Sequence, residues 1–97
     1  MRLLSVFLML SVLLASGSQL WAQKQISDDQ IYDQVRRKLA SDPVVKGGAL
    51  EVEVQDGVVT LRGKVREEKQ KNKAGRITKK VKGVKQVINE LVISPTG

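Results

Sequence analysis

The fold of this protein is decided by residues 50–65, which read LEVEVQDGVVTLRGKV. Apolar and polar side chains alternate on both sides of Asp56-Gly57, a pattern typical of strands with one buried face. An Asp-Gly pair between such runs favours a tight hairpin turn, because that turn needs a positive φ at both central residues. The stretch therefore predicts two antiparallel strands, 50–55 and 58–65. Gly63 falls on the inward side of the second strand, where it predicts a bulge or the close approach of a helix.

A helix is predicted over residues 28–40, ahead of the hairpin. Ser27 and Gln30 have the spacing of a capping box, in which each side chain bonds the other residue's backbone N–H. The apolar side chains recur every four residues, at Ile31, Val35 and Leu39. Pro43 ends the helix, because proline disfavours helical geometry in the residue before it. The dipeptide Gly47-Gly48 then predicts a flexible connection to the first strand.

A second helix is predicted over residues 67–82, followed by Gly83 as a left-handed stop. Gly75 lies inside this helix and weakens it by about 1 kcal/mol relative to alanine. The apolar stripe consists of Ala74, Ile77 and Val81, extended at its start by Gln70. A last strand is predicted over residues 84–93, and its inward side carries Asn89 among apolar residues. We expect the Asn89 amide to satisfy backbone groups near a strand end or a bulge.

The predicted order of elements is αββαβ. Two amphipathic helices and three strands can bury all their apolar faces in one two-layer α+β sandwich, with both helices on one face of the sheet. The hairpin makes the first two strands antiparallel. The helical crossover makes the second and third strands parallel, so the predicted sheet is mixed.

With these elements in place, residues 27–93 resemble a BON domain, the module named after bacterial osmotic-shock and nodulation proteins. The resemblance rests on the run D-G-x-V-x-L-x-G-x-V from Asp56 and on the closing run G-V-x-x-V-x-N-x-L from Gly83. Its structural motif residues are Asp56, Gly57, Gly63, Gly83 and Asn89. The resemblance implies a bacterial envelope protein with a role in attaching to phospholipid membranes and without a known catalytic site.

Many members of that family carry two such domains, whereas one is recognisable here. A function that needs a tandem pair would then require self-association or a protein partner. Helix 67–82 is also more basic than the family pattern requires.

The first 22 residues have the order of a secretory signal peptide. Arg2 precedes an apolar run from Leu3 to Ala15, and small residues follow it. A 13-residue helix rises only about 20 Å, against a hydrocarbon layer of about 30 Å. We expect cleavage after Ala22 and export to the periplasm or cell envelope; cleavage after Gly17 and an uncleaved anchor are the alternatives. Residues 23–26 form a polar lead-in and 94–97 a flexible C-terminal tail.

Composition argues against most catalytic chemistry. The 97 residues contain no Cys and no His, which excludes a disulfide framework, thiolate metal sites and the most common general base. The paired carboxylates open helices or lie on the outward side of a strand, and Ser27 is explained as a helix cap. We therefore expect no enzymatic activity, no cofactor, no metal site and no small-molecule substrate.

Positive charge is concentrated in residues 62–85, which hold 11 basic and 2 acidic residues within a chain of net charge +7. On the predicted second helix, one flank collects Lys69, Lys73, Arg76 and Lys80. This flank predicts peripheral electrostatic attachment to an anionic phospholipid surface. A solvated helix face, a protein–protein module supporting an envelope assembly or stress response, and an acidic polymer or protein partner are the alternatives. The export signal and the lack of stacking aromatic residues disfavour nucleic acid.

Overall fold

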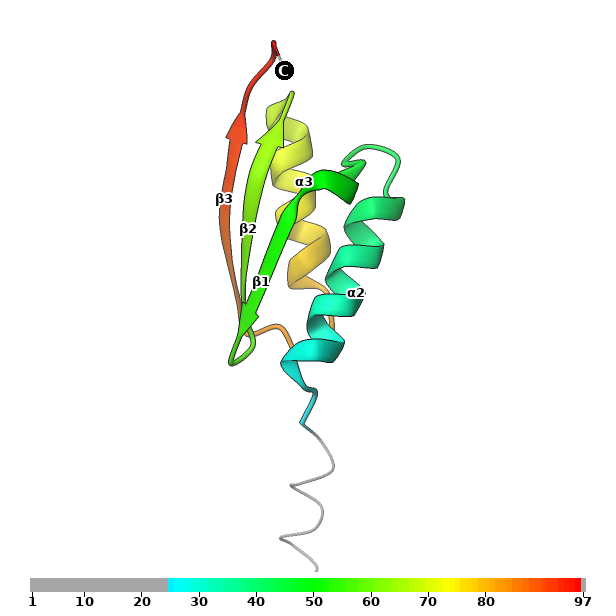
Figure 1. The fold of residues 1–97 in the computed structure, drawn as a ribbon, viewed down its shortest axis with the longest axis vertical. Coiled ribbons are helices and arrows are strands. Elements are labelled where there is room, and N and C mark those ends of the chain that lie inside the picture. Colours follow the sequence, from blue (N-terminus) through cyan, green and yellow to red (C-terminus); the bar gives the residue numbers. More distant parts are fainter. Residues whose placement is uncertain (1–24, 97) are drawn as a thin grey trace, which may run out of the picture.

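The computed structural model describes residues 25–96, which form two helices packed on one face of a three-stranded sheet (Figure 1). The elements in chain order are α2 (Asp28–Ser41), the 3₁₀ turn η1 (Gly47–Ala49), β1 (Glu51–Gln55), β2 (Val58–Val65), α3 (Glu68–Lys79) and β3 (Gln86–Ile93). The predicted αββαβ order and α+β class are confirmed. The predicted signal peptide and its cleavage after Ala22 lie outside the described residues.

The sheet has the order β1-β2-β3, so β2 is the central strand. β1 pairs with β2 in antiparallel register, with Val54 opposite Val59, and β2 pairs with β3 in parallel register, with Leu61 opposite Asn89. The mixed sheet is thus confirmed. At the hairpin, Asp56 has φ 51° and Gly57 has φ 80°, the pair of positive values that the Asp-Gly turn predicts.

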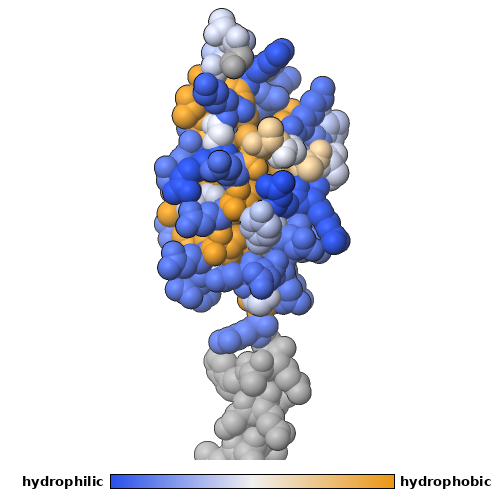
Figure 2. All heavy atoms as spheres, in the orientation of Figure 1, coloured by the Kyte–Doolittle hydropathy of each residue, from blue (hydrophilic) through white to orange (hydrophobic). Residues whose placement is uncertain are grey.

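The hydrophobic core lies between the sheet and the helices. Val59 and Leu61 of β2 are fully buried at 0% exposure, and Leu91 of β3 is 1% exposed. The predicted α2 stripe is buried against them, at Ile31, Val35 and Leu39. No helix among residues 25–96 covers the other face of the sheet, where Figure 2 shows apolar side chains over β2 and β3 between hydrophilic ones.

The start of α2 is fixed both locally and to the hairpin. The backbone N–H of Gln30 donates to the Ser27 hydroxyl at 3.2 Å and that of Ser27 donates to the Gln30 side-chain oxygen at 3.1 Å, which confirms the capping box. Asp28 adds a contact that the sequence pattern does not predict. Its two carboxylate oxygens accept hydrogen bonds from the backbone N–H groups of Asp56 at 2.9 Å and Gly57 at 3.0 Å. The helix N-terminus is thereby attached to the hairpin turn.

The connection between α2 and β1 has a defined conformation, so the expectation of a flexible Gly47-Gly48 link is wrong. Asp42 orders its beginning, because Oδ1 accepts from the backbone N–H groups of Val44 at 2.9 Å and Val45 at 3.0 Å. Gly47 is buried, and a Cβ placed on it would lie 3.0 Å from the Cβ of Leu39. The glycine lets the chain pass close to α2.

The second helix is shorter than predicted, ending at Lys79 instead of Lys82, and β3 begins at Gln86 instead of Val84. Beyond the helix, the chain tightens into turns in which the N–H of Val81 donates to the carbonyl of Thr78 at 3.1 Å. These turns bring Val81 into the core at 5% exposure. Gly83 follows with φ 97°, and a Cβ there would lie 3.1 Å from Ile26 and from Ile31. Gly83 therefore redirects the chain after the turn instead of ending the helix itself.

Gly63 allows a close approach, but the approaching group is not a helix. It lies just past the last β1–β2 pair, has φ 134°, and a Cβ on it would stand 2.9 Å from Cδ2 of Leu50. Leu50 is itself buried at 5% exposure. The missing side chain thus makes room for the residue that leads into β1.

Asn89 faces α3 and satisfies a backbone group there, as the sequence predicts, although in the body of a regular strand. Its Nδ2 donates to the carbonyl oxygen of Lys71 at 2.8 Å. A Cβ on Gly75 would lie 3.0 Å from this same Nδ2. The glycine that weakens α3 locally therefore opens the space through which β3 hydrogen-bonds to the helix.

The contact between Gly75 and Asn89 predicts that Gly75→Ala changes stability differently in the native protein and in the Asn89→Ala variant. In the Asn89→Ala background it should stabilise the protein by about 1 kcal/mol, because alanine favours the helix. In the native background the new Cβ displaces the Asn89 amide, and the lost hydrogen bond, about 1 kcal/mol, cancels or reverses that gain. Urea unfolding of the two single variants and the double variant measures the coupling. Equal effects of Gly75→Ala in both backgrounds would contradict this assignment.

Candidate electrostatic binding surface

Helix α3 turns a cationic side towards solvent. Its buried residues, Ala74 and Thr78, face the rest of the protein. Arg76 lies between them in sequence and, at 100° per residue, on the opposite side of the helix. The exposed residues of the helix are Glu68, Lys69, Asn72, Arg76 and Lys79. The predicted outward direction of Lys69 and Arg76 is thus seen in the structure, as is the exposure of Lys80 just beyond the helix.

Lys73 has a different setting from the other three residues of the predicted flank. Its Nζ lies 3.1 Å from Oδ2 of Asp42, and the two side chains are only 34% and 13% exposed. This ion pair links α3 to the loop that follows α2. Lys69 is also near a carboxylate, at 3.7 Å from Glu67, but that pair is well exposed at 70% and 61%. Lys73 therefore links α3 to the loop after α2. The positive charge of Lys69 is partly neutralised by Glu67.

Several cations in the last turn of α3 and just beyond it have no ion pair among residues 25–96. We call Arg76, Lys79, Lys80, Lys82 and Lys85 the basic surface; all five are exposed. Two members, Arg76 and Lys79, belong to the last turn of α3, where positive charge also favours the helix dipole. Sequence reasoning missed Lys79, Lys82 and Lys85 as members. The sequence shows that these lysines lie close together along the chain. It does not show the turns after α3 that place Lys82 and Lys85.

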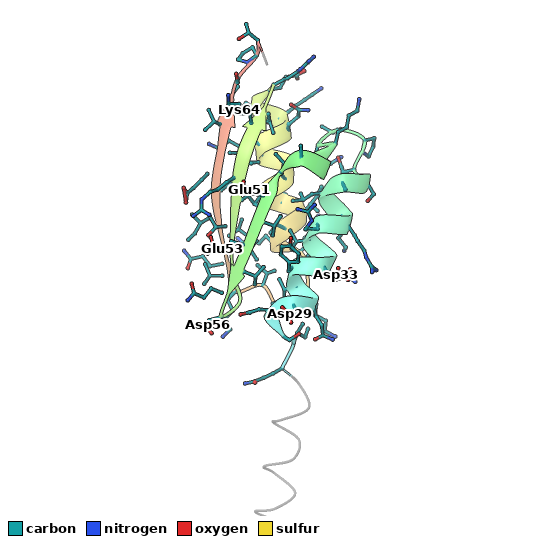
Figure 3. The ribbon with its side chains drawn as sticks, in the orientation of Figure 1. Asp29, Asp33, Glu51, Glu53, Asp56 and Lys64 are labelled. Carbon is teal, nitrogen blue, oxygen red and sulfur yellow. The ribbon has the colours of Figure 1, made fainter. Side chains whose placement is uncertain are left out.

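Negative charge lies mainly on other elements. Figure 3 labels acidic side chains on α2, on β1 and at the hairpin, including Asp29, Asp33 and Glu53. On the open face of the sheet, Arg62 lies 2.8 Å from Glu53 and 3.9 Å from Glu90. The hydrogen bond to Glu53, with the nearby charge of Glu90, raises the pKa of the Arg62 guanidinium. Arg62 is thus neutralised locally and stands apart from the basic surface.

The Asp42 carboxylate is held in its charged form. The backbone N–H of Val45 is the main cause that lowers its pKa, and the hydrogen bond from Lys73 and the N–H of Val44 act in the same direction. A carboxylate whose pKa is lower in the folded state stabilises the fold above its unfolded pKa. That contribution is lost as the pH falls through the lowered folded pKa.

We therefore expect Asp42→Asn to make stability less dependent on acid pH. Asparagine keeps a side-chain oxygen for the two backbone N–H groups but removes the charge that pairs with Lys73. The variant should be less stable than the native protein at pH 7, and the difference should shrink below about pH 4. Urea midpoints measured along a pH series report this directly. A difference that stays constant into acid would show that the charge is unimportant.

Residues 25–96 contain no group of three His, Cys, Asp or Glu side chains able to hold a metal ion. In the same part of the chain, no helix is both long and apolar enough to cross a membrane. What the described surface can do chemically is attract and orient anions.

The family model of the BON domain matches residues 27–95. The chain therefore belongs to the BON family, as its sequence motifs suggested. It is also 39% identical over 64 residues to osmotically-inducible protein Y of Escherichia coli (strain K12), and the alignment covers 66% of this chain and 32% of that protein. The chain thus spans about a third of the length of this relative.

Proposed function

We propose that this protein is a non-catalytic binding module of the bacterial envelope that attaches peripherally to anionic phospholipid membranes. Family membership and the similarity to an osmotically inducible protein support an envelope or stress-related role. The observation that carries the membrane proposal is the basic surface, whose five exposed cations have no ion pair in the described part of the chain. An export signal in residues 1–22 would deliver the domain to such membranes.

The basic surface suits attachment without insertion. Each basic residue near an anionic leaflet contributes about 1 kcal/mol, so several acting together give useful binding. Interfacial insertion normally uses Trp or Phe, and residues 25–96 contain neither. Tyr32 lies on α2 with Arg36 over its ring, 5.7 Å from the centroid to Cζ. The attraction is therefore electrostatic and sensitive to salt.

Co-sedimentation with vesicles tests this function. Binding of the full-length chain should rise with the fraction of phosphatidylglycerol in phosphatidylcholine vesicles. It should fall steeply as NaCl is raised from about 0.01 M to about 1 M, because the Debye length shortens from about 30 Å to about 3 Å. Equal binding to neutral vesicles, or binding indifferent to salt, would contradict electrostatic attachment.

A protein-interaction module is the second candidate, and the open edge of β3 favours it. β3 pairs with β2 alone in the described sheet, and its exposed apolar residues are Ile88, Val92 and Ile93, at 39%, 57% and 40% exposure. Unpaired strand edges can accept a strand from a partner. A stoichiometric partner lost on Val92→Lys, but retained when the basic surface is reversed in charge, would support this function over membrane attachment.

A further inference from the structure

A second concentration of positive charge surrounds a hollow of about 310 Å³ near the start of α3. Its basic lining residues are Lys46, Lys64 and Arg66, and no acidic residue of the described chain lines it. Three other hollows of the described residues are each lined by at least one carboxylate, such as Asp33 or Asp56. In Figure 3, Lys64 lies at the end of the sheet opposite the hairpin that carries Asp56. None of the five residues of the basic surface lines the hollow, so the two are distinct.

The three cations approach the hollow from two chain segments. Lys64 and Arg66 flank Val65, which is buried at 6% exposure. Lys46 comes from the loop before η1. None of the three has an acidic partner within 4.0 Å among residues 25–96.

Lys46 occupies a backbone conformation that costs free energy. Its φ of 49° and ψ of 48° are left-handed, a region that glycine or asparagine adopts more easily than lysine. A strained position at the rim of a charged hollow points to a role for the side chain. No described contact explains a lysine at this position.

The two walls of the hollow are held together by hydrogen bonds. The Gln70 side chain accepts from the N–H of Arg66 at 2.8 Å and donates to the carbonyl of Val44 at 3.0 Å. On the other side, Asp42 accepts from the N–H of Val44 and pairs with Lys73. The backbone that carries Lys46 and Arg66 is therefore fixed before any ligand binds, which reduces the entropy cost of binding.

We propose that this hollow, formed by Lys46, Lys64 and Arg66, binds the phosphate group of a phosphate monoester. The planar guanidinium of Arg66 can donate two parallel hydrogen bonds to phosphate oxygens, and the two ammonium groups supply point charges. Three cations around one hollow repel one another when it is empty, and a dianion relieves that repulsion. Val45, Leu50 and Val65 are buried and also line the hollow, so part of its wall is apolar.

Titration of the ¹⁵N-labelled full-length chain with glycerol 3-phosphate tests the site, with glycerol at the same concentration and NaCl at matched ionic strength as controls. Saturable amide shifts should centre on residues 45–50 and 64–70. Lys46→Asn, which suits the left-handed backbone, combined with Lys64→Gln and Arg66→Gln should weaken binding at least about tenfold. The matched control changes the same net charge on the basic surface: Lys79→Gln, Lys80→Gln and Lys82→Gln should leave the affinity within about twofold.

The same variants identify where the phosphate comes from. If glycerol 3-phosphate saturates the site, the ligand is a soluble ester. If it gives no shifts, yet phosphatidic acid in phosphatidylcholine vesicles binds and the Lys46, Lys64 and Arg66 variant loses that binding, the ligand is a lipid headgroup. Shifts that map to the basic surface, equal losses in both triple variants, or no binding of either probe would overturn the proposal. Attachment to phosphatidylglycerol through the basic surface would stand in each case.

Discussion

Affinity for phosphatidylglycerol vesicles is expected to fall by about a thousandfold or more when four residues of the basic surface are reversed in charge. The variant carries Arg76→Glu, Lys79→Glu, Lys80→Glu and Lys82→Glu. Each native cation contributes about 1 kcal/mol near an anionic leaflet, so four removed contacts correspond to about 4 kcal/mol before repulsion is added. None of the four side chains is buried or ion-paired in the described structure, so the fold should survive. Vesicle co-sedimentation measures the loss, and circular dichroism checks the fold.

The control reverses the three cations that line the hollow near the start of α3, with Lys46→Glu, Lys64→Glu and Arg66→Glu. It changes the net charge by −6, against −8 for the four-residue variant. If membrane attachment depends on the basic surface, this control should keep most of its affinity for phosphatidylglycerol vesicles. A comparable loss in both variants would show that net charge alone governs binding. A folded four-residue variant that still binds fully would rule out the basic surface as the attachment site.

Gly63→Ala is expected to destabilise the domain by about 2–4 kcal/mol, because it combines backbone strain with a steric clash. The backbone at this position has φ 134°, which side chains rarely adopt. The new Cβ would also stand 2.9 Å from Cδ2 of Leu50, a side chain that is buried at 5% exposure. For a domain of this size, each kcal/mol lowers Tm by about 4–8 °C, so the transition should move by about 10–30 °C.

Gly48→Ala is the matched control for that prediction. Gly48 is exposed, has no positive φ, and a Cβ on it would meet nothing within 4 Å. Alanine there should leave stability unchanged or raise it by up to about 1 kcal/mol, because it restricts the unfolded chain. Thermal melts of the two variants side by side report the difference. A Gly63→Ala protein that melts with the native one would show that Leu50 and the strand adjust freely.

Local patterns predicted the elements because their signals repeat within one turn or one pleat. The capping box of α2 and the Asp-Gly hairpin are confirmed in detail, since both depend on neighbouring residues only. The errors lie where distant residues decide the outcome. The end of α3 is set by the burial of Val81, and the order of the Gly47 loop is set by packing on Leu39.

In the candidate site, too, local signals were predictable and contacts between distant residues were not. Helical spacing correctly placed Arg76 on the solvent side, but it could not reveal that Lys73 pairs with Asp42, which is far away in sequence. The net charge of residues 62–85 was visible in the sequence. The sequence did not show that Lys64 and Arg66 line a hollow separate from the basic surface. That hollow is completed by Lys46, which the loop before β1 brings there.

The position of β2 in the middle of the sheet has a consequence for protein synthesis. β3, the last strand among residues 25–96, supplies one whole side of the β2 ladder. If translation stops before Gln86, the product lacks β3. One edge of β2, which pairs with β3 in the native sheet, is then unpaired and can pair with other chains. Such a truncated product should aggregate or be degraded, and it should not persist as a smaller working domain.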